Sequence, residues 1–212
     1  MADLARAREN LLNYLDHEIA DGRVVEAMRR VRREAFVSAE QHDAAYDDRP
    51  LSIGFGQTIS QPFIVALMVQ ALELKGREQV LELGTGSGYE AAILAELAQK
   101  VITVEYVPEL AESAKKVLDK LGYSNVEVHV AGKTLGWPDG APYDAIIVSA
   151  GAPSVPQVLL EQLAWDGRLV IPVGSRWQQD LLKVTKLKKG NRIENLDGCY
   201  FVPLIGEGAW GK

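Results

Sequence analysis

Three glycines at alternate positions form the first candidate functional motif of the sequence. Gly84, Gly86 and Gly88 directly follow the apolar run 80–83, so a short strand should lead into a glycine-rich loop. Glycine lets the backbone turn tightly and lets a ligand approach the main chain closely. Loops that bind dinucleotides have the spacing Gly-x-Gly-x-x-Gly, which places a pyrophosphate at a helix N-terminus, whereas Tyr89 stands at the third glycine position here. The spacing therefore favours S-adenosylmethionine, which has no phosphate, over NAD.

An acidic residue ends the next predicted strand. Glu105 lies 21 residues after Gly84, and a carboxylate in this place can accept hydrogen bonds from both ribose hydroxyls of a nucleoside cofactor. Together, the loop and the acid predict a site for S-adenosyl-L-methionine and its product S-adenosyl-L-homocysteine. The role of Glu82 stays open between the loop amides and the amino group of the cofactor. The expected cofactor contacts in this region are Glu82, Gly84, Thr85, Gly86, Ser87, Gly88, Glu105 and Tyr106.

The elements that must position this loop alternate between strand and helix. Strands are expected at 80–83, 101–105, 126–130, 144–148 and 169–173, and helices at 62–74, 89–98, 108–121 and 155–163. Pro62 and Pro108 suit the first turn of a helix, and Asp166-Gly167 predicts a turn before the fifth strand. This alternation predicts a parallel sheet with right-handed crossovers.

The two ends of the sequence differ from the alternating core. Apolar residues recur at helical spacing through 3–45 with a break at Asp21-Gly22, while residues 46–61 lose that period and predict a loop. Residues 181–187 and the stretch from 193 onward predict an antiparallel hairpin. The expected fold class is α/β, a Rossmann-like doubly wound and mostly parallel sheet with an antiparallel C-terminal hairpin and an N-terminal helical layer. We expect one domain over 1–212, with a helical and substrate-loop region at 1–75, a cofactor-binding core at 76–175 and antiparallel strands at 176–212.

Composition and charge narrow the class of protein. The 212 residues carry a formal net charge of −6, which argues against a nucleic-acid partner because phosphates favour basic proteins. The basic run Arg29-Arg30-Val31-Arg32-Arg33 is interpreted as a solvated helix face. The lone cysteine, Cys199, excludes an intrachain disulfide and is interpreted as a packed strand residue. Without a signal-peptide pattern or a membrane-length apolar run, we expect a cytoplasmic monomer with no membrane partner and no metal site.

Residues 149–153 argue further against a nucleic-acid substrate. Enzymes that methylate exocyclic amines of bases usually carry an Asn-Pro-Pro-Tyr-like run after the fourth strand. Ser149-Ala150-Gly151-Ala152-Pro153 offers neither an amide nor an aromatic platform for a flipped base.

Several stretches, spread over nearly the whole chain, carry a resemblance to a known family. They are 50–62, the glycine loop with Gly88-Tyr89, 143–148, 167–174 and 201–204, and the most specific is Thr58-Ile59-Ser60 followed by Gln61-Pro62. On these stretches the sequence resembles the protein-L-isoaspartate (D-aspartate) O-methyltransferase family of class I S-adenosylmethionine-dependent methyltransferases. The resemblance implies a protein-repair enzyme that methylates the free α-carboxyl of L-isoaspartyl and D-aspartyl residues in damaged proteins and peptides. It also implies that Ser60 is the active-site residue, and the candidate substrate contacts beside it are Gln57, Thr58, Ile59, Val202 and Pro203.

The chemistry of a carboxyl acceptor agrees with this role for Ser60. A carboxylate is ionised at neutral pH, with a reference pKa of about 4, so it needs orientation against the methyl group and no general base. A hydroxyl donor can hold one carboxylate oxygen and leave the other free to attack. Ser60 also has a structural alternative, a helix N-cap just ahead of Pro62, and both roles can hold at once.

One stretch departs from the family pattern. Where members usually show Gly-Asp-Gly after the third strand, with the Asp accepting a hydrogen bond from the adenine amino group, this chain has Ala131-Gly132-Lys133. Gly132 and Lys133 remain candidate adenine contacts, but no carboxylate is carried over. Nearby, His129 is interpreted as a strand residue whose ring could flank the nucleoside, and Asp144 as a residue that faces the site or caps a loop.

Two other functions stay open. An NAD-linked oxidoreductase is disfavoured by the glycine spacing and by the lack of a Tyr-x-x-x-Lys run. A protein that binds S-adenosylmethionine or isoaspartyl peptides with little turnover is kept open by the glycine at position 132.

Overall fold

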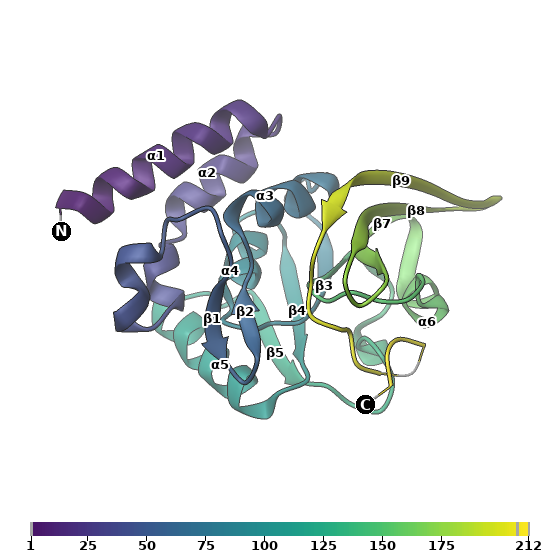
Figure 1. The fold of residues 1–212 in the computed structure, drawn as a ribbon. Coiled ribbons are helices and arrows are strands. Elements are labelled where there is room, and N and C mark those ends of the chain that lie inside the picture. The colour runs from purple at the N-terminus through teal and green to yellow at the C-terminus, as the bar shows by residue number, and fades with distance from the viewer. Residues whose placement is uncertain (1, 207, 212) are drawn as a thin grey trace.

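A seven-stranded sheet forms the centre of the structure, a computed structural model that describes residues 2–206 and 208–211. The strand order is β5-β4-β3-β6-β7-β8-β9 (Figure 1). Strands β3 to β7 are parallel, and β8 and β9 run antiparallel to their neighbours. The bounds are β3 (Gln79–Leu83), β4 (Lys100–Glu105), β5 (Val126–Val130), β6 (Tyr143–Val148), β7 (Leu163–Gly174), β8 (Gln179–Leu187) and β9 (Gly190–Cys199). The predicted α/β class with an antiparallel C-terminal hairpin is confirmed.

Two apolar layers cover the faces of the sheet. One contains α3 (Pro62–Ala71), α4 (Tyr89–Ala95) and α5 (Pro108–Leu121), with α1 (Ala2–Glu18) and α2 (Gly22–Arg30) outside them (Figure 1). The other contains α6 (Gln157–Gln162) and the chain around Leu135, just before the 3₁₀ helix η3 (Pro138–Gly140). In β3, Val80 belongs to the first layer and Leu81 to the second. Because both faces are covered, the central strands are nearly continuous apolar runs.

The N-terminal region contains less α-helix than the pattern over 3–45 predicts. α2 ends at Arg30, and two short 3₁₀ helices follow, η1 (Arg33–Phe36) and η2 (Ala39–Ala44). The backbone is extended at Val31 and again at Val37, which interrupts the hydrogen-bond ladder that a continuous helix needs. The prediction of α-helix up to residue 45 was therefore wrong after residue 30, where two 3₁₀ helices take its place.

The predicted loop 46–61 contains a small antiparallel hairpin. β1 (Leu51–Gly54) pairs with β2 (Gln57–Ile59). Gly54, Phe55 and Gly56 close it with φ angles of 85°, 53° and 71°, a left-handed conformation that glycine tolerates best. Strands of four and three residues are too short to give a clear alternation of apolar and polar positions, so the pattern missed them.

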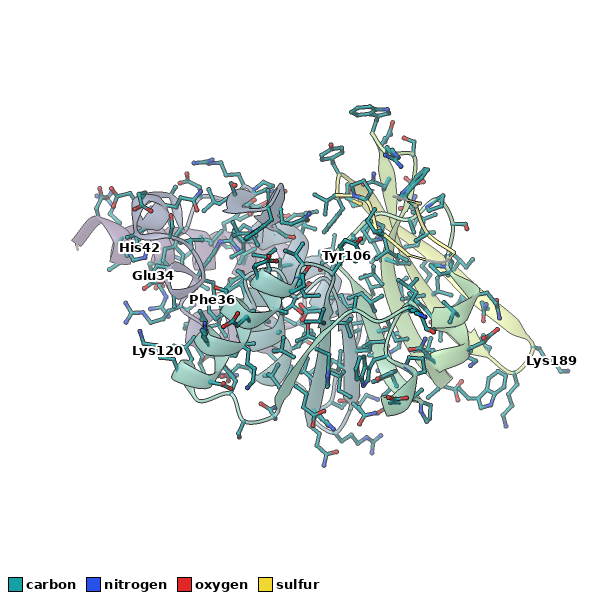
Figure 2. All side chains as sticks on the ribbon, turned by 90° about the horizontal axis from the view of Figure 1, so that it is seen from below. Glu34, Phe36, His42, Tyr106, Lys120 and Lys189 are labelled. Carbon is teal, nitrogen blue, oxygen red and sulfur yellow. The ribbon has the colours of Figure 1, made fainter. Side chains whose placement is uncertain are left out.

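The boundary between α6 and β7 also differs from the prediction. β7 begins at Leu163, so the predicted turn Asp166-Gly167 lies inside a strand. Asp166 has a φ of 62°, and the pairing of β6 with β7 shifts between Tyr143 and Ala145. The turn signal therefore marks an irregularity in a long strand. Lys189 lies at the tip of the projecting β8–β9 hairpin (Figure 2).

Within residues 2–206 and 208–211, no helix combines the length and the apolar character that crossing a bilayer requires.

Candidate active site

A cavity of about 580 Å³ opens beside the carboxyl ends of β3, β4, β5 and β6. Strand β3 lies between β4 and β6, so the cavity marks the point where the strand order reverses, the usual ligand site of such sheets. Its volume falls in the ordinary range for small-molecule sites. Tyr106, which lines it, lies near the middle of the molecule, between the helical layer and the C-terminal strands (Figure 2). The wall includes the segments 57–61, 83–87, 104–107, 131–136, 149–150 and 198–206.

The glycine loop requires its glycines. Gly84, Gly86 and Gly88 have φ angles of 96°, 52° and 88°, which side-chain-bearing residues rarely adopt. The space beside the loop is also restricted. A Cβ on Gly84 would lie 3.4 Å from the Ser149 Cβ, and one on Gly86 would lie 3.3 Å from the Ile53 Cδ1. The loop is thus held between the end of β6 and the β1–β2 hairpin.

Glu105 ends β4 and faces the cavity with both carboxylate oxygens already engaged. Oε2 accepts a hydrogen bond from the Gly86 N–H at 2.8 Å, and Oε1 accepts one from the Val107 N–H at 2.9 Å. Each oxygen keeps a further lone-pair direction for a ligand hydroxyl. The side chain therefore fixes the loop and can bind a ribose with the same group.

Glu82 does not have the first of its two predicted roles, because the bond to the loop amide comes from Glu105. The Glu82 side chain is fully buried beside the Thr103 hydroxyl and the Glu90 carboxyl group, and no N–H or O–H group of the described residues reaches its oxygens with hydrogen-bond geometry. Glu82 does not line the cavity, whereas Leu83, Glu90 and Ser149 do. Thr85 and Ser87 line the cavity as predicted, and the Thr85 hydroxyl shares a hydrogen bond with Thr103 at 2.5 Å.

The segment after β5 forms the far wall of the cavity. The Ala131 N–H donates to the Glu105 carbonyl at 2.7 Å, and Gln162 anchors the next turn by accepting from the Trp137 N–H and donating to the Leu135 carbonyl. Gly132 and Lys133 line the cavity, and a Cβ on Gly132 would meet no atom within 4 Å. This wall presents backbone groups and one lysine, with no carboxylate of its own.

Ser60 lies in the cavity wall with its hydroxyl uncommitted. The cap of α3 comes from Asp48, which accepts a hydrogen bond from the Phe63 N–H at 2.9 Å and another from the Gln61 side chain at 2.9 Å. No hydrogen bond of the described residues engages the Ser60 hydroxyl. The N-cap alternative for Ser60 is therefore wrong, because a residue twelve positions earlier performs that task.

Arg33 supports the Ser60 segment from behind. Its Nη2 donates to the Ser60 carbonyl at 2.8 Å, and its guanidinium lies 4.8 Å from the centre of the Tyr89 ring. The side chain is 0% exposed, so the interpretation of the run 29–33 as a solvated face is wrong for its last member. The helix break at Val31 turns Arg33 inward.

The remaining wall comes from the chain after β9. The Gly151 N–H donates to the Val202 carbonyl and the Leu204 N–H donates to the Gly151 carbonyl, both at 2.8 Å. These bonds hold Val202 and Pro203 beside the end of β6, and both residues line the same cavity as Gln57, Thr58 and Ile59. Cys199 is a strand residue as predicted and also lines the cavity. Burial raises the pKa of its thiol to about 11, so it is a poor nucleophile at neutral pH.

Four candidates are not among the described residues that line the cavity: Glu82, Gly88, His129 and Asp144. His129 is in β5 and its ring stacks on Trp137 at 4.0 Å between centroids. Asp144 lies at the opposite end of β6 from the cavity and accepts a hydrogen bond from the Gln79 N–H at 2.9 Å. The strand role of His129 and the capping role of Asp144 are confirmed.

Sequence reasoning missed three polar residues that shape the site: Arg33, Asp48 and Glu90. Glu90 is the one acidic residue of the otherwise apolar helix α4, and it lines the cavity. A single charged residue in an apolar helix indicates a functional side chain, so this pattern could have identified Glu90 from the sequence. Arg33 and Asp48 act on Ser60 and α3 from other segments, so neighbouring residue types give no indication of them.

A doubly wound sheet with this glycine turn after β3 and a cavity-lining carboxylate at the end of β4 defines the class: the chain is an S-adenosylmethionine-dependent methyltransferase. Residues 6–209 match the family model "Protein-L-isoaspartate(D-aspartate) O-methyltransferase". The chain belongs to this family, and its activity is the family's methyl transfer to isoaspartyl and D-aspartyl residues.

Individual relatives agree with the family model. The chain is 52% identical over 212 residues to a protein-L-isoaspartate O-methyltransferase of Syntrophobacter fumaroxidans, covering 99% of both chains. It is 56% identical over 212 residues to one of Marinobacter nauticus, covering 99% of this chain and 96% of the relative. A solved protein-L-isoaspartate O-methyltransferase has a TM-score of 0.85 at 30% identity, covering 95% of this chain and 67% of the other. A Plasmodium falciparum protein assigned the same activity, solved in complex with S-adenosyl-L-homocysteine, has a TM-score of 0.76 at 27% identity, covering 92% and 96%.

Proposed function

We propose that Ser60 holds the isoaspartyl α-carboxylate in this cavity, against a cofactor bound along the glycine loop. The observation that carries the proposal is the free hydroxyl of Ser60, which faces the same cavity as Gly84 to Ser87 while Asp48 caps α3. The hydroxyl donates to one carboxylate oxygen and leaves the other to attack. Since the acceptor is already ionised, the protein supplies orientation, which can contribute up to ~7–11 kcal/mol to lowering a barrier.

The cofactor orientation follows from the polar groups of the wall. Glu105 binds the ribose hydroxyls, and Tyr106 lies beside it. The segment Ala131-Gly132-Lys133 binds adenine through its backbone, and Gly84, Thr85, Gly86, Ser87 and Gly88 hold the amino-acid end. S-adenosylmethionine supplies an electrophilic methyl group on a sulfonium.

The peptide crosses the cavity mouth between two backbone segments. Gln57, Thr58 and Ile59 form one side, and Val202 with Pro203 forms the other. The mixed polar and apolar lining suits a polypeptide main chain with one side chain inserted. Arg33 keeps the first segment in place through the Ser60 carbonyl.

Paired peptides test this function directly. One peptide contains L-isoaspartate at a single position and its control contains L-aspartate at the same position. We expect base-labile methyl ester on the first alone, and a Ser60→Ala variant that binds cofactor normally but forms ester slowly. Equal methylation of both peptides would contradict the acceptor assignment.

The remaining partner and compartment assignments are part of the same proposal. The net charge of −6 and the sequence pI near 5.2 support an enzyme without a nucleic-acid partner. The single cysteine supports a reducing cytoplasm. A hydrophobic core shared from Leu11 to Phe201 supports one methyltransferase domain, which we propose acts as a monomer.

A further inference from the structure

Two buried carboxyl groups lie side by side behind the glycine loop. Glu82 on β3 is 0% exposed and Glu90 on α4 is 8% exposed. The Ser149 hydroxyl donates a hydrogen bond to Oε2 of Glu90. The two carboxyl groups lie close enough to interact with each other, and Glu82 also lies beside the Thr103 hydroxyl, but no N–H or O–H group of the described residues reaches Oε1 of Glu90 or the Glu82 oxygens with hydrogen-bond geometry. An unpaired carboxylate in such a place is costly, so the pair needs either a proton or a cation.

The groups that face this pair come from every neighbouring strand. Thr103 and Glu105 face Glu82 from β4, and Ser149 faces Glu90 from the end of β6. No ion pair of the described chain involves Glu82, Glu90 or Glu105. Lys133, the one basic side chain in the described cavity wall, belongs to the segment after β5. The side chains around the pair therefore offer one further carboxylate and two hydroxyl groups.

Protonation is the state that these surroundings favour in the free protein. Burial raises the pKa of Glu82 well above its usual value, and the Glu90 carboxylate adds to the rise. Burial also raises the pKa of Glu90 to about 7, against the opposing hydrogen bond from Ser149. Glu90 therefore carries a proton at mildly acidic pH and exchanges it near neutrality.

Of the two glutamates, only Glu90 lines the cavity, and it lies on the side of Ser149. Glu105 on β4 and Ser149 after β6 lie on opposite sides of β3, two strand spacings or roughly 10 Å apart. If Glu105 binds the ribose, the amino-acid end of the cofactor lies toward Ser149 and Glu90. Its ammonium group can then donate a charge-assisted hydrogen bond to Oε1 of Glu90.

We propose that Glu90 binds the ammonium group of the cofactor and gives up its proton as it does so. This inference rests on the proposed orientation of the cofactor. The protonated Glu90 carboxyl loses its proton to solvent, the carboxylate that remains accepts N–H bonds from the ammonium group, and one proton is released for each cofactor bound. Glu82 keeps its own proton, so the buried pair never carries two charges.

Isothermal titration calorimetry without acceptor peptide tests the proposal. S-adenosyl-L-homocysteine, which has the ammonium group, is titrated at pH 6.0 in two buffers of different protonation enthalpy. We expect nearly one proton released per ligand bound, and affinity that rises about tenfold between pH 5.5 and 6.5. In Glu90→Gln, no proton is released and the affinity is flat across this range. Glu161→Gln, an equal charge change at an exposed position on α6, behaves as the unmodified chain.

A second ligand keeps the test decisive if Glu90→Gln folds poorly. 5′-Methylthioadenosine keeps the nucleoside and lacks the ammonium group, so it should bind the unmodified protein without releasing a proton. Proton release with methylthioadenosine, persistence of the release in Glu90→Gln, or none at pH 6.0 in the unmodified protein would each overturn the inference. Because no acceptor is present, these results are independent of whether isoaspartyl peptides are methylated.

Discussion

Arg33 donates a hydrogen bond from Nη2 to the main-chain carbonyl of Ser60, at 2.8 Å, from a position with no exposed surface. The two residues are 27 positions apart in the sequence. Since the bond reaches the backbone of Ser60, it controls where the hydroxyl lies without engaging the hydroxyl itself.

Arg33→Met should therefore displace Ser60. It leaves the Ser60 carbonyl without its charged donor, which costs ~1–3 kcal/mol, and removes the contact with the Tyr89 ring. We expect kcat for an isoaspartyl peptide to fall at least tenfold while the Kd for S-adenosyl-L-homocysteine changes less than threefold. Arg32→Met is the matched control, since the exposed Arg32 side chain pairs with Glu34 and not with the Ser60 segment. Equal losses in both variants would show that Arg33 does not position the site.

Ser60→Ala tests the hydroxyl itself. A hydrogen bond to a charged acceptor contributes ~1.5–3 kcal/mol, so we expect kcat/KM for the isoaspartyl peptide to fall roughly 10- to 150-fold. Because Asp48 caps α3, the urea midpoint of unfolding should stay within experimental error. Asp48→Ala, in contrast, should lower the free energy of unfolding by ~1 kcal/mol because α3 loses its cap. A Ser60→Ala variant with full activity would refute the proposed role of the hydroxyl.

Gly132→Asp should tighten cofactor binding. The position has room for a side chain and does not have a left-handed backbone, so an aspartate fits without strain. Its carboxylate would add an acceptor for the adenine amino group, which is expected to lower the Kd of S-adenosylmethionine by one to two orders of magnitude. Gly132→Ala controls for the loss of glycine flexibility. An unchanged Kd in Gly132→Asp would indicate that backbone groups already satisfy adenine.

Glu90→Gln should make the free protein more stable at high pH. The pKa of Glu90 is about 7 in the folded chain against 4.5 for the ordinary group, so the folded state holds the proton more tightly than the unfolded chain does. The stability that this proton contributes is complete below pH 4.5 and is lost as the pH rises through 7. Glutamine keeps the neutral state at all pH values, so we expect a gain of about 3 kcal/mol at pH 8.5 and about 1 kcal/mol at pH 5. Urea unfolding at both pH values measures the difference, and a gain that is equal at both would contradict the assignment.

The core of the fold and half of the site could be predicted from the sequence because they depend on neighbours in the chain. Val80 to Gly88 contains the strand, the turn and the helix start that make the loop, and Glu105 follows at the end of the next strand. Asp48 and Arg33 could not be predicted because they act across the fold on α3 and on Ser60. The basic run that contains Arg33 has the composition of an exposed face, and only the extended backbone at Val31 reverses its direction.

The β1–β2 hairpin escaped prediction for a different reason. Its strands are too short for a periodic signal, and its pairing depends on the positive φ angles of Gly54, Phe55 and Gly56. Its position depends on packing, since Ile53 approaches the glycine loop so closely that a Cβ on Gly86 would lie 3.3 Å from the Ile53 Cδ1.

The uncommitted hydroxyl of Ser60 also bears on how the product leaves. In the proposed geometry the acceptor arrives as an anion and departs as a neutral ester. Hydrogen bonds to a charged acceptor are roughly twice as strong as those to a neutral one, so Ser60 holds the substrate more firmly than the product. Arg33 lies behind Ser60 and donates to its main-chain carbonyl, and Lys133, the one cation in the described cavity wall, belongs to the segment after β5. The esterified peptide is therefore free to dissociate and to cyclise in solution.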